Sequence, residues 1–358
     1  MTHQELPSYD QAPAGALRFN TDSRKLEVYC GGPVGFGTTT ITGAWYQIDS
    51  FTPEIATGGT RGIFSGGYDS THLATQDFVN IDTTGNAQNF GDMTKARGQH
   101  ACCASRTRGF NAGGTTNPNS ATQSDYEILT IASTGSAVAG NSLGSGLAYG
   151  TGLSNSTRGI FGCFSTSNDR IDYVTMASLG NAVDFGNLTD SRSEAGSCQS
   201  STRGLFLGGQ SGVPVGLGLV NFIDFITIST LGNAADFGDL LTLKEQGGSS
   251  SNSVRGLYAG QEQPARTNTI EFVTIATLGN SQDFGDLTQA RNQLGGAASP
   301  TRGVFFGGVN PSPTPGEMFT TIDYVQIMST GNAIDFGDLQ NDRRRNPPQG
   351  ISNGHGGL

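Results

Sequence analysis

Arginines and acids that recur along the chain are the residues best placed for chemistry. An arginine precedes a glycine at six points that are 45 to 52 residues apart: Arg61, Arg108, Arg158, Arg203, Arg255 and Arg302. Acids recur with a similar period: Asp77, Glu127, Asp172, Asp224, Glu271 and Asp323. The arginines could form an anion-binding ring. Because every repeat has one, we expect instead that each guanidinium satisfies carbonyl groups of the next repeat, and that the acids bind backbone amides or nearby arginines.

Catalysis would need residues that break the repetition. A glycosidase needs two carboxylates about 5 to 10 Å apart, and Glu262 and Glu317, in segments of variable length, are acids that could pair in space. The chain has no phosphate-binding loop, nucleophile elbow or metal-binding motif. We therefore expect no catalytic residues, no cofactor and no enzymatic activity.

Cysteines and histidines do not follow metal-ligand or disulfide-framework spacing. The chain has five cysteines, Cys30, Cys102, Cys103, Cys163 and Cys198, and four histidines, His3, His72, His100 and His355. Cysteine is among the most buried residue types. We expect small buried thiols and no metal site.

The elements that position these residues are four short strands per repeat. In the fourth copy, residues 192–200 give a strand of small residues, which we call strand A. Residues 203–209 then give strand B, residues 223–228 strand C, and residues 233–239 strand D. Strand C is apolar on both faces, so it needs cover on both sides, as stacked propeller blades provide. A period near 50 with a Gly-Gly doublet is typical of kelch-type blades.

Closure of the ring is also predicted. The first copy begins at Thr60 without a strand A, whereas residues 341–353 supply a strand A without a successor. This strand should complete the first blade and hide both open edges. The sequence therefore predicts an all-β protein, with a six-bladed kelch-like β-propeller over residues 51–358 and a short N-terminal β-hairpin module over residues 1–50.

Copy two departs most from the pattern. Residues 138–141 replace the Phe-Gly-Asp of strand D, and Ile128 replaces the aromatic residue of strand C. We expect its blade to be the least well packed. In the other copies, the strand D residues Phe185, Phe237, Phe284 and Phe336 should be buried between blades.

Loops of variable length join strands B and C, and they share one face of a meander with the loops between strands D and A. Insertions restricted to one face of a repeat array mark its binding surface. The longest segments are residues 210–222, 261–268 and 309–321, and the candidate ligand-facing residues in them are Gln210, Val213, Gln261, Gln263, Asn310 and Glu317.

The N-terminal module contains a hairpin and the chain's single tryptophan. Apolar and polar residues alternate on both sides of a turn at residues 20–23, and residues 44–48 follow a Gly/Thr-rich loop. About 50 residues bury little core alone, so we expect the module to complete itself against other chains or against the propeller. The candidates for docking on the particle are Leu17, Phe19, Leu26, Val28, Trp45 and Tyr46.

Charge and hydropathy limit the partners. A net charge of −10 disfavours nucleic acid, and no stretch has the roughly 20 apolar residues that would insert in a membrane. The N-terminus lacks a signal-peptide pattern, which favours synthesis in a cytoplasm.

The repeats of the form Thr-Arg-Gly-x-Phe-x-Gly-Gly, with Ile-Asp-Tyr-Val-Thr-Ile and Gly-Asn-Ala-x-Asp-Phe-Gly-Asp, resemble the kelch-like repeat proteins of tailed phages over residues 60–353. The leader is similar to a short module of phage tail fibres. This resemblance implies a structural protein of the virion, on the tail or decorating the capsid, assembled in the host cytoplasm in many copies. Its partners would be other virion proteins and a host-surface glycan or protein. The alternative is a free carbohydrate-binding or carbohydrate-processing propeller.

Overall fold

The computed structural model describes residues 16–20, 25–30, 44–47, 59–117, 121–212, 218–261, 267–310, 317–343 and 350–358. The chain divides into two compact units, Met1–Thr57 and Gly58–Leu358. The predicted boundary after residue 50 falls slightly before this division. Each unit is described by itself.

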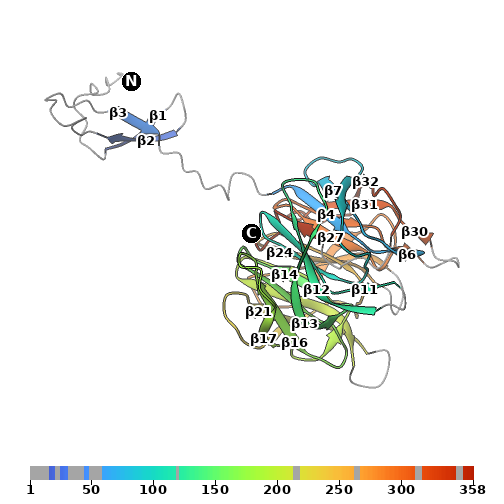
Figure 1. Ribbon diagram of the computed structural model, residues 1–358. Coiled ribbons are helices and arrows are strands. Elements are labelled where there is room, and N and C mark those ends of the chain that lie inside the picture. The colour runs from blue at the N-terminus through green and yellow to red at the C-terminus, as the bar shows by residue number, and fades with distance from the viewer. Residues whose placement is uncertain are drawn as a thin grey trace. The chain divides into compact units, whose positions relative to one another are not determined.

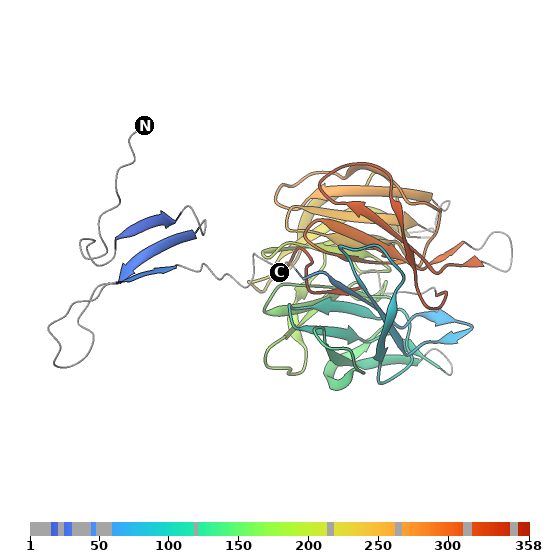
Figure 2. The same ribbon diagram turned by 90° about the horizontal axis from the view of Figure 1, so that it is seen from above.

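The larger unit is a six-bladed β-propeller (Figures 1 and 2). The strands below are given from the axis outward. Blade 1 consists of β33 (Ile351–Ser352), β4 (Arg61–Ser65), β7 (Thr75–Asn80) and β8 (Gln88–Asp92). Blade 2 consists of β9 (Ala101–Ala104), β10 (Arg108–Ala112), β12 (Ala121–Thr130) and β13 (Val138–Leu147). Blade 3 consists of β14 (Thr151–Ser154), β15 (Arg158–Gly162), β16 (Arg170–Thr175) and β17 (Val183–Asn187).

The other three blades have the same order of strands. Blade 4 consists of β19 (Gly196–Gln199), β20 (Arg203–Ser211), β21 (Leu219–Thr227) and β22 (Ala235–Asp239). Blade 5 consists of β23 (Gly248–Ser251), β24 (Arg255–Gln261), β25 (Thr267–Thr274) and β26 (Gln282–Asp286). Blade 6 consists of β27 (Gly295–Ala298), β28 (Arg302–Phe306), β31 (Thr321–Gln326) and β32 (Ile334–Asp338). Two short strands pair with blade strands: β11 (Thr115–Thr116) with β12 and β18 (Arg192–Ser193) with β20. Two separate hairpins are formed by β5 (Tyr68–Asp69) with β6 (Thr71–His72) and by β29 (Val309–Asn310) with β30 (Glu317–Met318).

The ring closes as the sequence predicted. Strand β33 pairs antiparallel with β4, with Ile351 opposite Ile63 and Ser352 opposite Gly62. The six innermost strands contact one another in the order β33, β9, β14, β19, β23 and β27, and β27 returns to β33. The first blade therefore takes its inner strand from the last part of the described chain, which leaves neither blade edge open at the junction.

Aromatic rings fill the space between blades. The strand D phenylalanines predicted to be buried, Phe185, Phe237, Phe284 and Phe336, are 2% to 3% exposed. Each packs edge-on against the aromatic residue of strand C in its own blade, with ring centroids 5.9 to 6.2 Å apart. Such edge-to-face pairs add to the stabilisation from buried area.

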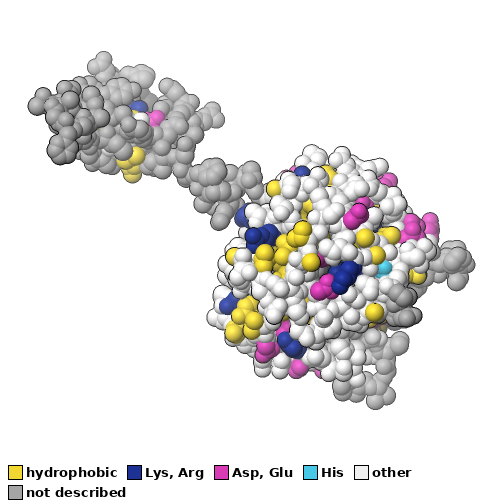
Figure 3. Space-filling view, viewed as in Figure 1, with side chains coloured by type: hydrophobic (Ala, Val, Ile, Leu, Met, Phe, Trp, Pro, Cys, Tyr) yellow, Lys and Arg dark blue, Asp and Glu magenta, His cyan; other side chains and the backbone are white. Residues whose placement is uncertain are grey.

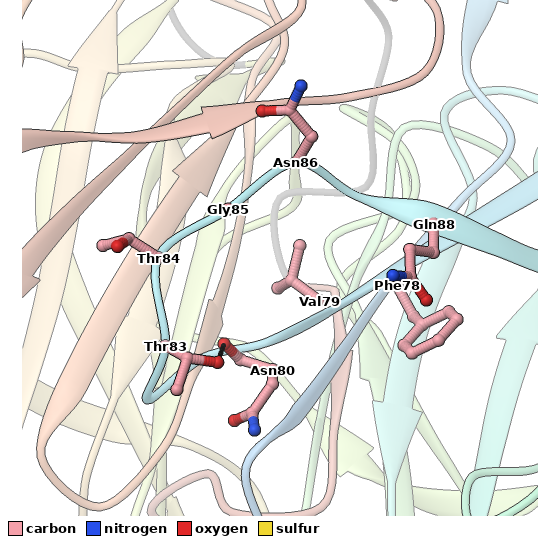
Figure 4. Close-up of a pocket in the computed structure, with 8 residues that line it drawn as sticks. All are labelled: Phe78, Val79, Asn80, Thr83, Thr84, Gly85, Asn86 and Gln88. Atoms are coloured by element: carbon pink, nitrogen blue, oxygen red, sulfur yellow. Dashed lines mark hydrogen bonds between the residues drawn. The ribbon is translucent and has the colours of Figure 1, made fainter.

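The turn between strands C and D joins each blade to the preceding one. In blade 1, Gly85 N donates to Phe336 O at 2.8 Å, and Asn86 Oδ1 accepts from Asp338 N at 3.1 Å (Figure 4). A Cβ on Gly337 would lie 2.6 Å from Gly85 O. The close approach of the two backbones explains the glycine of the Phe-Gly-Asp phrase. A Cβ on Gly85 would meet nothing within 4 Å, so the glycine of the Gly-Asn phrase is explained instead by its φ of 152°.

Blade 2 places a buried ring where its sequence departs from the repeat. Gly140 stands at the strand D position that holds Phe185 in blade 3, and a Cβ on it would lie 2.4 Å from the ring of Tyr126. Tyr126 is fully buried, and its hydroxyl donates to Gly180 O of blade 3 at 2.8 Å. A ring from strand C thus fills the space that strand D leaves empty.

The smaller unit contains a three-stranded antiparallel sheet: β1 (Leu17–Asn20), β2 (Lys25–Cys30) and β3 (Ala44–Gln47). Strand β2 lies in the middle, with Val28 opposite both Leu17 and Tyr46. The predicted hairpin is therefore present, with a third strand paired to it.

Candidate functional site

The six repeated arginines bridge neighbouring blades. Each donates from Nη1 to a backbone carbonyl at the end of strand C in the next blade, at 2.7 to 3.3 Å. The acceptors, from the arginine of blade 1 to that of blade 6, are Ile131, Met176, Ile228, Ile275, Ile327 and Ile81. Except in blade 2, each guanidinium also lies over the strand C ring of its own blade. This is the capping arrangement expected from the sequence.

The repeated acids form buried ion pairs. In five blades the partner is a buried basic residue just before strand A: Arg343 with Asp77, Arg97 with Glu127, Arg192 with Asp224, Lys244 with Glu271, and Arg291 with Asp323, at 2.6 to 3.5 Å. Burial raises the pKa of Asp77 despite the charge of Arg343. Buried pairs of this kind cost much to break because a lone charge would remain in the core.

The two ends of the propeller axis differ. Turns between A and B and between C and D share one end, here called the uniform face. Loops between B and C and between D and A share the other, here called the variable face. In Figure 2 the hairpins β5–β6 and β29–β30 project from the variable face, on the side away from the end marked C.

The candidate ligand-facing residues have different surroundings. Gln210 and Asn310 are half-buried and Glu317 is exposed. Gln261 is only 3% exposed, and its Oε1 accepts from Thr242 Oγ1 at 3.3 Å, so the prediction that it faces a ligand is wrong. Gln261 stands at the second position of the glycine doublet, where strand β24 ends. Val213 and Gln263 lie outside the described residues.

A ring of left-handed residues surrounds the axis at the variable face. Five blades place a non-glycine residue with φ between 55° and 63° just before strand A: Gln99, Tyr149, Glu194, Gln246 and Gln293. The amide of each of the last four donates to the carbonyl of the ring member before it, at 2.7 to 3.1 Å. Non-glycine residues in this conformation are uncommon and store strain, which occurs most often at functional sites.

A hollow of about 580 Å³ lies on this face. Blades 2, 3 and 4 line it with Thr122, Gly146, Ala148, Tyr149, Phe164, Ser165, Thr166, Ser193, Glu194 and Gln210. Two ring members, Tyr149 and Glu194, belong to its wall. By contrast, the hollow shown in Figure 4, at the C–D turn of blade 1, has about 220 Å³. A similar hollow of about 230 Å³ recurs in blade 5, so these smaller hollows follow the repeat.

Blade 3 breaks the repeat beside this cavity. Leu147 stands where the other blades have a buried arginine or lysine, so Asp172 pairs instead with Arg170 of its own strand, at 2.6 Å. Cys163 and Phe164 replace both residues of the glycine doublet, and Cys163 keeps the glycine-like φ of 59°. Phe164 forms a β-bridge with Ser193 of blade 4. These departures of blade 3 therefore lie around one hollow.

The cavity has a weakly acidic, polar lining. Glu194 is its one ionisable carboxylate, and Gln246 Nε2 donates to Glu194 Oε2 at 2.9 Å. No lysine or arginine is among the residues that line it. Figure 3 shows that charged side chains are sparse on the face in view, where most of the surface is white. Burial raises the pKa of the adjacent Cys163 thiol to about 11, so this thiol is protonated at neutral pH and is a poor nucleophile.

At the uniform face the end of the described chain enters the axis. The His355 ring donates from Nε2 to Ala104 O at 2.9 Å, and its Nδ1 accepts from Gln199 Nε2 at 2.8 Å. Gly356 N donates to Ser251 O of blade 5 at 2.9 Å. Burial lowers the pKa of His355 to about 4, so the ring is neutral.

The remaining thiols and imidazoles are buried. Cys102, Cys103 and Cys198 are free thiols like Cys163, as expected, whereas the side chain of Cys30 lies outside the description. His72 contacts Asn117 and Thr115, and His3 lies outside the described residues. No group of three or more potential metal ligands occurs among the residues that the structure describes.

The docking candidates of the smaller unit lie on two faces of its sheet. Leu17 pairs with Val28 across β1 and β2, so these two share one face, and the pairing sets Phe19 opposite Leu26 and Tyr46 opposite Val28. Trp45 lies on the other face, where its ring contacts Tyr29 and carries the Arg18 guanidinium at 4.4 Å. Leu17 is 60% exposed, whereas Tyr29 and Glu27 are buried.

Comparison with protein-family models gave no match, and comparison with curated proteins also gave none. Across the described parts of the chain, no helix has the length and hydropathy to cross a membrane.

Proposed function

We propose that this protein is a non-enzymatic structural component of a phage particle, anchored through its N-terminal unit, with the propeller displayed outward to contact the host surface. The repeat phrases and the fibre-like leader motif support this role by resemblance. One observation of the fold carries the proposal further, and it concerns where the chain enters the propeller.

The chain enters at the uniform face. Gly59 N donates to Asn353 O at 3.2 Å, next to the A–B end of blade 1. The variable loops and the cavity lie at the opposite end of the axis. A particle that held residues 1–57 would therefore leave the variable face accessible, and weak contacts through many copies would add up to firm attachment.

Binding fits the cavity better than hydrolysis does. Hydrolysis of a glycosidic bond generally uses a pair of carboxylates, and the lining includes one carboxylate, Glu194. A free carbohydrate-processing propeller is the second candidate, and turnover of glycans by the purified protein would favour it.

Reconstruction of purified particles by electron cryomicroscopy tests the proposal. We expect the protein at fixed stoichiometry, with residues 1–57 in contact with other virion subunits and the variable face toward solvent. A propeller that faces the particle interior, or a chain that is absent from particles, would contradict it.

A further inference from the structure

We propose that the cavity between blades 2, 3 and 4 is a binding site for a neutral saccharide. This inference deepens the proposed function and rests on it for biological context: it assigns the host-surface contact to one site and one class of ligand. The site is built around Tyr149, Phe164, Ser193, Glu194 and Gln210.

The first argument is where the repeat is broken. In a repeat protein, packing requires similar residues at equivalent positions of every blade. Where several neighbouring positions in one blade differ from the repeat, we infer that packing does not determine their residue types. Leu147 and Cys163 replace repeat residues only in blade 3, and Phe164 replaces a glycine that is otherwise missing only in blade 5, at Gln261. Tyr149 is the aromatic member of the strained ring. Apart from Gln261, these positions lie in or beside the cavity wall.

The second argument is the chemistry of the lining. The Tyr149 side chain is the exposed aromatic surface, with the residue 39% accessible, and an aromatic ring can pack against the C–H groups of a pyranose. Hydroxyls of Thr122, Ser165 and Thr166, the Gln210 amide and the Glu194 carboxylate provide hydrogen-bond donors and acceptors around it. Sugar hydroxyls act in both roles, so they match this lining.

Charge and size narrow the ligand class. With Glu194 in the wall, no lysine or arginine lining it, and a net charge of −10 on the chain, the site disfavours anionic sugars and phosphates. A volume of about 580 Å³ lies within the usual range for small-molecule sites and suits a short oligosaccharide. A protein partner would need a much larger surface than this hollow offers.

Titration calorimetry of the full-length protein tests the site. The probes are five neutral trisaccharides, maltotriose, cellotriose, laminaritriose, mannotriose and N,N′,N″-triacetylchitotriose, with trigalacturonate as the acidic comparison. We expect at least one neutral trisaccharide to bind and trigalacturonate not to bind. Binding of trigalacturonate alone would overturn the ligand class, and binding of none would overturn the inference.

Two variants locate the binding. Tyr149→Asn removes the aromatic ring, and asparagine tolerates the φ of 63° at this position. The Kd for the neutral trisaccharide should therefore rise at least about tenfold. Gln293→Asn is the matched control, because it changes a ring position with φ of 55° outside the cavity lining, and its Kd should stay within about twofold of wild type. Wild-type affinity in Tyr149→Asn would overturn the site.

Glu194→Gln gives a second measurement if Tyr149→Asn fails to fold. It should weaken binding of the neutral sugar several-fold, and unchanged affinity would count against the site. These outcomes are independent of the particle reconstruction: an outward-facing propeller that binds no saccharide would refute only this inference, whereas binding by a protein absent from particles would refute only the virion role.

Discussion

The two faces of the propeller use the same repeat in different ways. On the uniform face, arginines cap carbonyls of the next blade six times over, and the Gly-Asn turn joins neighbouring blades. On the variable face, blade 3 loses its buried basic residue and its glycine doublet, and a cavity of about 580 Å³ lies beside those changes. Residues that recur hold the ring together, and residues that depart from the repeat mark where the molecule has room for a ligand.

Removal of the closing strand should have the largest effect on this comparison. Deleting residues 350–358 takes away β33 and the His355 contacts, and it exposes the inner edges of β4 and its neighbours. We expect aggregation and loss of a cooperative melt, measured by size-exclusion chromatography and circular dichroism. A monomeric truncated protein with an unchanged melting temperature would show that closure does not depend on this strand.

Loss of an interblade ring should come next. Phe237→Ala should lower the free energy of unfolding by about 3 to 5 kcal/mol in denaturant melts, because the ring is buried between blades. Tyr126→Ala should cost a similar amount, since its ring fills the corresponding space in blade 2. A loss below about 1 kcal/mol at either position would contradict this packing.

Acid should weaken the uniform face through His355. The folded pKa of about 4 lies below the usual value of 6.5, so between these pH values the unfolded chain binds a proton that the folded chain does not. The contribution of His355 to the free energy of unfolding is fully present above pH 6.5. It falls by roughly 3 kcal/mol as the pH drops to 4. Urea melts at several pH values should show a shallower decline for His355→Gln. An equal decline would assign the acid sensitivity to other groups.

The arginine caps should contribute less each. Arg203→Met keeps the apolar stem and removes the bond to Ile275 O, so it should cost about 1 to 2 kcal/mol. Arg108→Met is the control without a ring beneath the guanidinium, since Ile128 stands there. The Arg108 guanidinium donates to Ala177 O as well as to Met176 O, so the comparison concerns the loss beyond these carbonyl contacts. The control should cost less by about 0.5 to 1 kcal/mol, the value of a cation–π contact. Equal losses would show that stacking over Phe225 adds nothing.

Substitution on the variable face should have the smallest effect on stability. Tyr149→Asn should change the free energy of unfolding by about 0.5 kcal/mol or less, because the side chain is exposed and lies outside the interblade clusters. A loss above about 2 kcal/mol in thermal or denaturant melts would mean that Tyr149 supports the fold, and the contrast between the faces would weaken.

Repetition explains which features could be predicted. The blade count, the closing strand and the burial of Phe237 could be predicted from the repeated phrases. Equivalent residues have the same packing role in each blade, so one copy explains the others. The capping arginines are of the same kind. The N-terminal hairpin was predicted from the alternation of apolar and polar residues over 17–28. This alternation did not reveal that Trp45 lies on the face opposite to Leu17 and Val28.

The remaining features depend on contacts between different strands or blades. Tyr126 fills the space at Gly140 only because strands C and D face each other in that register. The cavity is formed by three blades together, and loop-length variation indicated only one of its lining residues, Gln210. A signal was nevertheless present, since copy three lacks the glycine doublet at Cys163 and Phe164.

The pairing of β33 with β4 also fixes when the molecule can be finished. Arg61 N bonds to Asn353 Oδ1 across 292 positions of the chain, so blade 1 must wait on the ribosome until almost all later blades have been translated. At ordinary rates of synthesis that delay is roughly 15 to 60 s. During it, the exposed edge of β4 is the strand that a chaperone would need to shield, and a neighbouring nascent chain could pair with it by mistake.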